Sequence, residues 1–228
     1  MNNDKSRLIL MISGKRTCGK DTVAKIIVDY LTSLAEIIPK TAFKLGFNVE
    51  DNINKMVEVM SFAKALKKTF CSDLGYDFDR MMNDYDYKEE HRADMTNYFM
   101  KMRYIEGEDY FSNILIDDIL SKHKYDSRIV IVSDLRLKGD LERFRELERG
   151  LLEKELEGDS ERCSYKVVVI RVNSTEESKS KRGWHKKRCD SDFTETDLDD
   201  CTDFDFVIDN DGTLEELKNK VLDTLMKI

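Results

Sequence analysis

The chain has 228 residues, of which 40% are hydrophobic and 37% are charged. A length of this order fits one large domain or two small ones and is enough to bury a core. Lys and Arg number 38 against 46 Asp and Glu, so the formal net charge is −8. This balance excludes the basic coat of a general nucleic-acid binder, so an anionic ligand has to be met by a local cluster of Lys and Arg.

The cysteine pattern bears on the compartment. The chain has five cysteines, an odd number, and none of them forms a C-x-x-C pair. This pattern disfavours a disulfide framework and a zinc site, and it favours a reducing compartment. No apolar run approaches the roughly 20 residues of a membrane-spanning helix, and the first residues do not resemble a secretion signal. We therefore expect a cytosolic monomer with no membrane span.

Short apolar runs alternate with stretches of helical periodicity along the chain. Strands are expected at 8–12, 56–62, 128–134, 166–172 and 204–208. Helices are predicted at 23–39, 63–74, 84–103 (one helix or a pair), 110–123, 141–152 and 214–225. This alternation, with few hairpin signals, predicts an α/β fold in which helices cover both faces of a parallel sheet.

Two polar segments interrupt the alternation. Residues 173–203 form a connection too long and polar for a simple turn, and such connections are often mobile lids. The charged segment 153–161 is expected to be a solvated helix end or loop. We predict a single domain over 1–228 with a lid at about 174–200.

A glycine-containing motif follows the first predicted strand and precedes the first predicted helix. It reads Gly14-Lys15-Arg16-Thr17-Cys18-Gly19-Lys20-Asp21 and has the G-x-x-x-x-G-K form of a phosphate-binding loop. The glycines let backbone N–H groups wrap a phosphate, and the helix N-terminus adds its partial positive charge. Lys20 would reach the β- and γ-phosphate oxygens. We expect the whole loop at 14–21 and Thr22 after it to bind ATP.

One position of the loop departs from the usual pattern. Asp21 stands where Ser or Thr normally coordinates Mg²⁺, so either Asp21 binds the metal or its waters, or Thr22 replaces the hydroxyl. Asp134 ends a predicted strand as a second acidic Mg²⁺ ligand would, although strand-end Asp residues also cap turns. Asp21 and Asp134 are the candidate metal ligands, and Mg²⁺ with ATP is the expected cofactor.

Five sequence blocks occur in a characteristic order. They are GKRTCGKD at 14–21, YKEEHRADM at 87–95, VSDLR at 132–136, RGW at 182–184 and FDFVIDN at 204–210. Together they resemble the animal-type phosphomevalonate kinase family over nearly the whole chain. The resemblance implies a P-loop kinase with a nucleoside-monophosphate-kinase-like fold that transfers the γ-phosphoryl group of ATP to (R)-5-phosphomevalonate. The products would be (R)-5-diphosphomevalonate and ADP, in the mevalonate route to isoprenoids and sterols.

The resemblance also implies roles for single side chains. The implied catalytic residues are Lys20, Arg16, Arg136 and Arg182, the last of them in the lid. The implied acceptor ligands are Lys67, Lys88, Arg92, Arg103 and Arg136, within a region at about 62–125. Asn210 and Asp211 would lie near the nucleotide, as would Arg182.

General chemistry is compatible with these roles. Joining two polyanions requires cations that cancel their repulsion and stabilise the charge of a loose transition state. Parallel strands place ligands at their carboxyl ends, where Gly14, Asp134 and the residues after Ile208 are expected to fall.

Each assignment has a plainer interpretation. Lys88 and Arg92 fit an ordinary helix face with i,i+4 ion pairs, and Lys67 fits a solvated helix flank. Arg136 alone fits a surface ion pair as well as a phosphate contact. The basic residues at 179–188 fit a nucleic-acid patch, but the acidic stretch that follows directly favours a nucleotide lid.

The chain also departs from the family. Leu137 stands where a second arginine is common and Thr17 where a further lysine is common, which predicts weaker acceptor binding or compensation by Lys138. Extra residues at 46–54 and 150–162 are interpreted as peripheral insertions.

Two other functions stay open. One is a nucleoside or deoxynucleoside monophosphate kinase, because the loop and lid alone do not choose the acceptor. The other is a non-catalytic nucleotide-binding module. The order of the five blocks argues against the first, and Lys20 with the acidic candidate ligands argues against the second.

Overall fold

The computed structural model describes residues 6–42, 57–122, 129–150 and 164–228. Within these ranges five strands form one parallel sheet in the order β2-β3-β1-β4-β5. The strands are β1 Ser6–Ser13, β2 Val57–Met60, β3 Ile129–Leu135, β4 Ser164–Asn173 and β5 Phe206–Asp209. The predicted parallel sheet is confirmed, and all five predicted strands are present within it.

The helices follow the predicted alternation, with differences at their ends. They are α1 Lys20–Ala42, α2 Phe62–Leu74, α3 Phe78–Asn83, α4 Tyr85–Glu90, α5 Arg92–Glu106, α6 Tyr110–Lys122, α7 Lys138–Glu148, α8 Glu176–Lys181, α9 Phe193–Thr196 and α10 Leu214–Leu225, with a 3-10 helix η3 at Arg188–Ser191. The predicted helix at 84–103 is a pair that divides at His91. Helices α3, α8 and α9 were not predicted, because helices of four to six residues show too little periodicity to be recognised.

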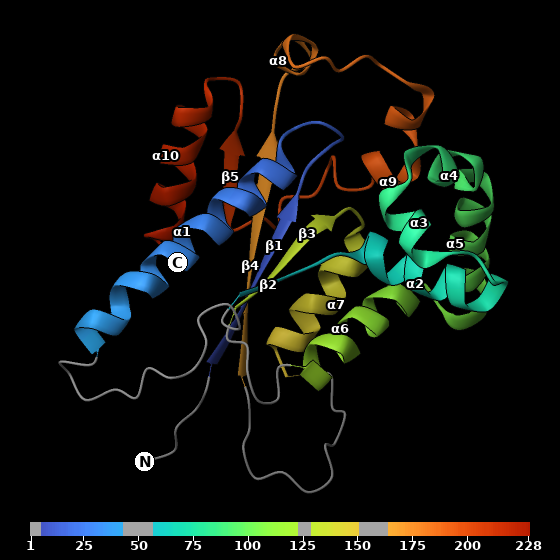
Figure 1. Cartoon of the computed structure of the whole chain (residues 1–228), viewed down its shortest axis with the longest axis horizontal. Coiled ribbons are helices and arrows are strands. Elements are labelled where there is room, and N and C mark those ends of the chain that lie inside the picture. Colours follow the sequence, from blue (N-terminus) through green and yellow to red (C-terminus); the bar gives the residue numbers. More distant parts are fainter. Residues whose placement is uncertain (1–5, 43–56, 123–128, 151–163) are drawn as a thin grey trace, which may run out of the picture.

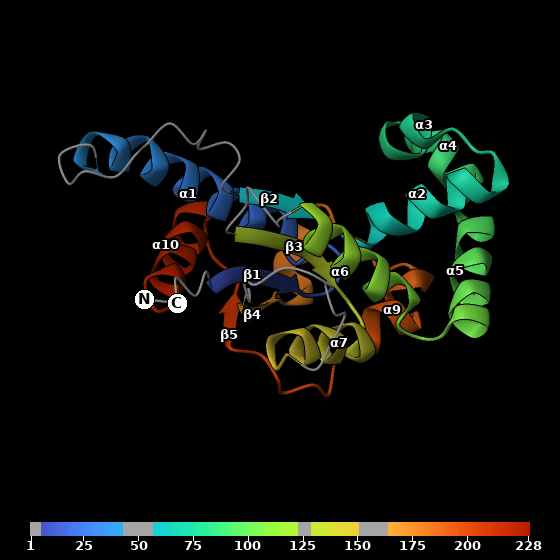
Figure 2. The same cartoon turned by 90° about the horizontal axis from the view of Figure 1, so that it is seen from below.

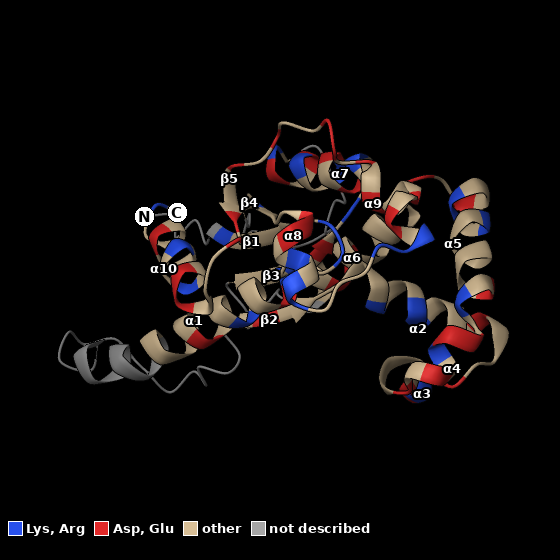
Figure 3. Ribbon diagram, turned by 90° about the horizontal axis from the view of Figure 1, so that it is seen from above, with Lys and Arg blue, Asp and Glu red and all other residues tan. Residues whose placement is uncertain are grey.

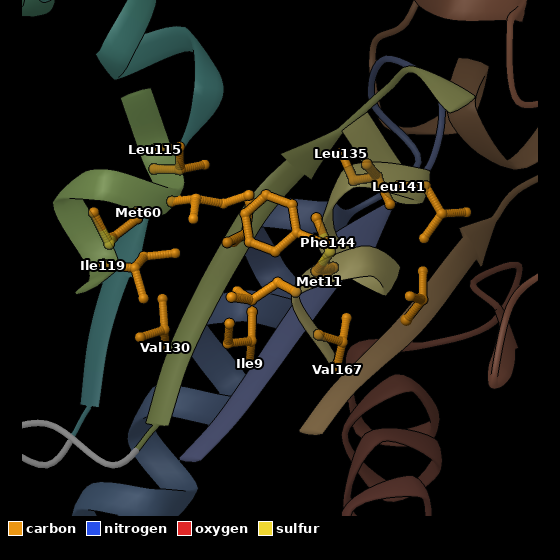
Figure 4. Close-up of a cluster of buried hydrophobic side chains, with 14 of the residues drawn as sticks. Ile9, Met11, Met60, Leu115, Ile119, Val130, Leu135, Leu141, Phe144 and Val167 are labelled. Atoms are coloured by element: carbon orange, nitrogen blue, oxygen red, sulfur yellow. The ribbon is translucent and has the colours of Figure 1, made fainter. Parts of the chain in front are cut away.

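The sheet is the middle of three layers (Figure 1). Successive side chains of a strand point to opposite faces, so β1 serves both layers. Ile9 and Met11 pack with residues of α6 and α7, among them Phe144 (Figure 4). Leu10 and Ile12 pack with residues of α1 and α10 on the other face. This burial on both faces explains why β1 is a continuous apolar run.

Helices α2 to α5 project beyond one end of the sheet (Figure 2). They share a small apolar cluster with α6 that includes Phe70, Met81, Tyr98 and Phe111. Ser61 caps the start of α2 by accepting a hydrogen bond from the backbone N–H of Lys64. Within the predicted region at about 62–125, α2 to α5 thus form a helical side lobe, while α6 also packs on the sheet.

The predicted lid at 174–200 contains α8, η3 and α9. It leaves the carboxyl end of β4 and returns to the body of the protein before β5 (Figure 1). Leu198, just after α9, is 3% exposed and belongs to the same core cluster as Phe144. The second half of the lid is therefore rooted in the core.

Some sequence predictions concern segments that lie outside the described residues. The proposed insertions at 46–54 and 150–162, and the charged segment 153–161, lie outside the described residues except for Gly150. Among the helices that the structure describes, none combines the length and apolarity needed to cross a bilayer.

Candidate active site

The phosphate-binding loop connects β1 to α1, and its two glycines are required sterically. Gly14 has φ 148° and Gly19 has φ 107°, which disfavour residues with a side chain. A β-carbon at Gly14 would collide with the Val172 carbonyl oxygen and the Cys18 Sγ. A β-carbon at Gly19 would collide with the side-chain amide of Asn210. The loop is therefore packed against β4 and the residue after β5.

Thr17 lies in the left-handed region with φ 58°, which is rare for a β-branched residue. Its hydroxyl donates a hydrogen bond of 2.7 Å to the carbonyl oxygen of Arg16. Such strain persists only where the surrounding structure fixes it, and it is concentrated at ligand sites.

Lys20 begins α1 and is 7% exposed. Its ammonium donates hydrogen bonds to the carbonyl oxygens of Gly14 at 2.5 Å and Lys15 at 2.9 Å. Burial lowers the pKa of Lys20, and the positive charge of Arg136 lowers it further. The ammonium is thus folded over the loop, from which a P-loop lysine reaches phosphate oxygens.

Asn210, directly after β5, braces the loop. Its side-chain amide donates a hydrogen bond of 2.8 Å to the carbonyl oxygen of Cys18, and the residue is 6% exposed. Its backbone N–H donates to the carbonyl oxygen of Asn173 at the end of β4. The structure therefore gives Asn210 a direct role in holding the loop, while its predicted contact with the nucleotide stays a prediction.

Asp211 and Arg182 meet beside this brace. Asp211 accepts hydrogen bonds from the backbone and hydroxyl of Thr175, and the backbone bond is the main cause that lowers the pKa of Asp211 to about 2. Arg182 donates to the Asn210 carbonyl oxygen at 3.0 Å and to the Ser174 hydroxyl at 2.6 Å. The lid arginine and the segment predicted to lie near the nucleotide are therefore brought together.

A cavity of about 410 Å³ adjoins these residues. It is lined by Lys15, Cys18, Arg171, Val172, Asn173, Ser174, Thr175, Asp199, Asp209 and Asp211. Its volume falls within the usual range of small-molecule sites. The cavity lies between the phosphate-binding loop and the carboxyl ends of β4 and β5, the edge at which parallel sheets bind ligands.

Carboxylates of the lid hold the cations of the loop. Asp190 accepts two hydrogen bonds from the guanidinium of Arg16, at 2.7 and 2.8 Å, and this contact lowers the pKa of Asp190 and raises that of Arg16. Lys15 pairs with Asp199 at 2.6 Å. Sequence reasoning missed these partners, although the acidic stretch after the basic half of the lid was a signal for them.

Glu195 connects three parts of the site. Its Oε2 accepts a hydrogen bond of 2.8 Å from the backbone N–H of Arg16, and its Oε1 pairs with the guanidinium of Arg136. The Glu195 side chain is 9% exposed. Arg136 directly follows β3, so this carboxylate joins the lid, the loop and the end of that strand.

Three of the predicted acceptor cations, on α2, α4 and α5, form a cluster on the side lobe. They are Lys67, Lys88 and Arg92. Burial is the main cause that lowers the pKa of Lys67, and the nearby charges of Lys88 and Arg92 contribute to the shift. Arg92 also pairs with Glu89 on the adjoining helix. In Figure 3 the lid after α8 is largely blue, and blue segments also lie on α2 and α5. Residues from α2, α4 and α5 thus bring positive charge to one place.

Arg103 has different surroundings. Its side chain is 12% exposed and lies 3.9 Å from Glu108. Its charge acts on Asp140, which accepts a hydrogen bond of 2.5 Å from the buried hydroxyl of Ser112. Burial raises the pKa of Asp140 to about 6. Arg103 therefore lies beside a buried carboxyl that sequence reasoning had not assigned to the site.

The two candidate Mg²⁺ ligands both lie within electrostatic range of Lys20. Asp134 accepts hydrogen bonds from the backbone N–H groups of Phe62 at 2.8 Å and Ala63 at 2.9 Å, so it holds the start of α2. Burial raises the pKa of Asp134, against the lowering effect of those bonds and of Lys20. Asp21 is exposed and acts electrostatically on Lys20 from the first turn of α1.

These carboxylates fit Mg²⁺ chemically, because the ion prefers hard oxygen ligands and keeps several waters. Asp21 lines a cavity of about 300 Å³ together with Ser133, the neighbour of Asp134. Among the described residues there is no group of three or more His, Cys, Asp or Glu arranged for a metal. The two carboxylates fit an ion whose remaining ligands are phosphate oxygens and water.

The structure also shows the surroundings of Leu137, which departs from the family pattern, and of its neighbour Lys138. Leu137 is 2% exposed and packs in the protein interior. Lys138 pairs with Asp200 of the lid at 2.7 Å, and its backbone N–H donates to Asp197. Compensation by Lys138 for a missing arginine stays a prediction, and in this structure its ammonium is bound to the lid.

Comparison with known proteins decides the family. The sequence model described as phosphomevalonate kinase matches residues 12–149. A phosphomevalonate kinase of Drosophila melanogaster is 30% identical over 223 residues, covering 96% of this chain and 94% of that protein. The chain belongs to the phosphomevalonate kinase family. It is accordingly an ATP-dependent phosphotransferase, and the resemblance stated from the five sequence blocks is confirmed.

Solved structures of low similarity were also found. TT1252 from Thermus thermophilus has a TM-score of 0.46 at 14% identity, covering 98% of this chain and 99% of that chain. Shikimate kinase from Acinetobacter baumannii has a TM-score of 0.42 at 11% identity, covering 98% and 95%. APS kinase from Mycobacterium tuberculosis has a TM-score of 0.42 at 12% identity, covering 97% and 99%.

Proposed function

We propose that this member of the phosphomevalonate kinase family transfers the γ-phosphoryl group of ATP to (R)-5-phosphomevalonate, giving (R)-5-diphosphomevalonate and ADP. The observation that carries the proposal is the meeting of two groups of cations. Asp134 lies within electrostatic range of both: the charges of Lys20 and Arg136 act on Asp134, and Asp134 in turn acts on Lys67, beside which lie Lys88 and Arg92. Such a site accommodates two phosphate groups, and the family supports phosphomevalonate as the acceptor.

On the donor side, the loop binds the phosphates of ATP through its backbone N–H groups and the start of α1. Lys20 and Arg16 neutralise the β- and γ-phosphates, and Arg182 binds the nucleotide at the base of the lid. The loop is already braced by Asn210, so little reorganisation is needed when the nucleotide enters.

On the acceptor side, Lys67, Lys88 and Arg92 bind the phosphate of phosphomevalonate, and Arg103 contributes from the end of α5. An oxygen of that phosphate attacks the γ-phosphorus of ATP. The bond between the γ-phosphorus and the bridging oxygen breaks, and its electrons leave with ADP. Arg136, whose charge acts on Lys20 and Asp134, stabilises the charge on the transferring phosphoryl.

Mg²⁺ bound with ATP supplies neutralisation of the β- and γ-phosphate oxygens. Asp21 and Asp134 would hold the ion or its waters. The lid, fastened to the loop through Asp190 and Asp199, excludes water from the site and so suppresses hydrolysis of ATP.

The setting of the enzyme completes the proposal. The product is an intermediate of the mevalonate pathway of isoprenoid and sterol biosynthesis. The four described cysteines are free, which supports a reducing compartment, and we place the enzyme in the cytosol as a monomer without nucleic-acid partners.

A coupled assay of ADP release tests the function directly. Phosphomevalonate is compared with a panel of nucleoside and deoxynucleoside monophosphates under the same ATP and Mg²⁺ concentrations. Turnover with phosphomevalonate is expected. Turnover only with monophosphates would make the chain a nucleotide kinase. ATP binding without ADP formation from any acceptor would make it a nucleotide-binding module.

A further inference from the structure

Glu195 is an acid inside a site built for anions. Its carboxylate accepts from the backbone N–H of Arg16 and pairs with the guanidinium of Arg136. It also acts electrostatically on Lys20. A carboxylate so close to bound phosphates is repelled by them, which disfavours phosphate binding. The contacts of Glu195 with Arg16 and Arg136 therefore have to favour the reaction in another way.

The segment that carries Glu195 is fixed on its C-terminal side. Leu198 is buried in the main core, and Asp197 accepts a hydrogen bond of 2.7 Å from the backbone N–H of Lys138 at the start of α7. Glu195 is therefore held by a rooted part of the lid, while the basic part around Trp184 lies further from this root in sequence. A rooted carboxylate suits a permanent contact better than one that leaves whenever ATP binds.

The contact with Glu195 restricts the side chain of Arg136. Its side chain is 30% exposed and follows the end of β3, where it would otherwise sample several rotamers. An arginine is most effective in catalysis when its orientation is fixed before the charge develops. Glu195 supplies one fixed oxygen for Arg136 and uses the other to tie the same carboxylate to the loop.

We infer that Glu195 is a positioning residue, which holds the Arg136 guanidinium between the donor and acceptor phosphates and links that position to closure of the lid on the loop. The inference rests on the proposed function of Arg136. Glu195 touches neither substrate in this scheme, and it acts through Arg136. Loss of Glu195 then lowers the rate of transfer while ATP still binds.

The test is a double-mutant cycle of Glu195→Gln and Arg136→Ala. Glutamine keeps the shape and one acceptor oxygen for the Arg16 N–H, and it removes the charge that fixes Arg136. The matched control is Asp192→Asn, because Asp192 is exposed on the same segment and its side chain does not cap α9. Trp184 is the only tryptophan of the chain and lies in the lid, so its fluorescence measures ATP affinity independently of turnover.

The expected result is a ten- to hundredfold lower kcat for Glu195→Gln, with the Kd for ATP changed by less than about threefold. In the Arg136→Ala background the same change is expected to remove less than about a further threefold, because the partner is already absent. Asp192→Asn is expected to retain kcat within about twofold.

Three outcomes would overturn the inference. They are an unchanged kcat in Glu195→Gln, a full additional loss in the Arg136→Ala background, and tighter ATP binding with undiminished kcat, which would make Glu195 a competitor of ATP. The cycle is run with whichever acceptor the wild-type protein turns over, or with ATP hydrolysis where it turns over none. A failure with phosphomevalonate therefore overturns the proposed function and leaves the coupling of Glu195 to Arg136 measurable.

Discussion

The loop that would bind ATP and the side lobe that would bind the acceptor hold their cations in different ways. On the loop, Arg16 pairs with Asp190, Lys15 pairs with Asp199, and Lys20 donates to carbonyl oxygens. On the lobe, the neighbours that act on the pKa of Lys67 include two further cations, Lys88 and Arg92. The cations of the loop are held by acids of the lid and by carbonyl oxygens, whereas on the lobe Arg92 is paired with Glu89 and Lys67 is repelled by Lys88 and Arg92.

The difference suits two anions that arrive in different ways. The loop is preorganised by internal partners, so its side chains are already oriented when ATP enters. On the lobe, burial and the repulsion of Lys88 and Arg92 work against the charge of Lys67, and a phosphate that binds there offsets that repulsion. We therefore expect changes on the loop to affect the rate of transfer most and changes on the lobe to affect acceptor affinity most.

The largest effect is expected for Lys20→Met, which removes the buried ammonium of the loop. We expect kcat to fall by about a thousandfold or more, with a modest change in the Kd for ATP, because the charge acts mainly in the transition state. Steady-state kinetics with Trp184 fluorescence for ATP binding measure both. Lys218→Met on the exposed face of α10 is the control, and equal losses in the two variants would contradict the assignment.

The buried carboxyl of Asp140 beside the lobe gives a pH dependence of stability. Burial raises its pKa from 3.8 to about 6, so the folded state keeps a proton that the unfolded state loses near pH 4. Its contribution to stability is therefore lost as the pH rises from about 4 to about 6. Over this window the unfolding free energy of the wild type, relative to Asp140→Asn, is expected to fall by on the order of 3 kcal/mol.

Urea unfolding of the two proteins between pH 4 and 7 measures this difference. Exposed Asp223 on α10 supplies the matched control, Asp223→Asn. A difference between wild type and Asp140→Asn that does not vary with pH would show that folding leaves the pKa of Asp140 unshifted.

Arg136→Ala tests the arginine that pairs with Glu195 of the lid. We expect about a hundredfold loss of kcat with phosphomevalonate, because one charged donor is removed from the transferring phosphoryl group. The change is read from initial rates at saturating ATP. A kinetically silent variant would remove Arg136 from the site and, with it, the proposed positioning role of Glu195.

The smallest effect is expected for Lys67→Met on the lobe. The KM for the acceptor is expected to rise about tenfold while the KM for ATP stays the same, since a hydrogen bond to a charged group contributes roughly 1.5–3 kcal/mol. Lys68→Met is the control, because Lys68 is the exposed neighbour on the same helix. A larger rise in the KM for ATP than in the KM for the acceptor would contradict the expectation that the lobe binds the acceptor.

Much of the fold was predictable because its signals are local. The apolar run of β1 is buried on both faces, and the spacing of Gly14 and Gly19 is required by the packing of the loop against Val172 and Asn210. The predicted start of α7 was wrong by three residues, since Lys138, Gly139 and Asp140 form its polar first turn. Polar first turns carry no apolar periodicity.

The sequence predicted which cations belong to the site, but it did not predict the hydrogen bonds and ion pairs that hold them. The sequence alone identified Lys20, Arg136 and the loop, because their neighbours in the chain form motifs. It could not identify the hydrogen bonds of Asp134 to the start of α2, which join residues 72 and 71 positions apart. Nor could it identify Glu195 as a partner of Arg16, which lies 179 positions away.

The sequence by itself determined the succession of strands and longer helices along the chain, the phosphate-binding loop and the family. The tertiary structure decided which acid balances which cation, and so which charges remain for a substrate. The physical reason is that strand and loop formation depend on neighbouring residues, whereas an ion pair forms only where folding brings two distant side chains within a few ångströms.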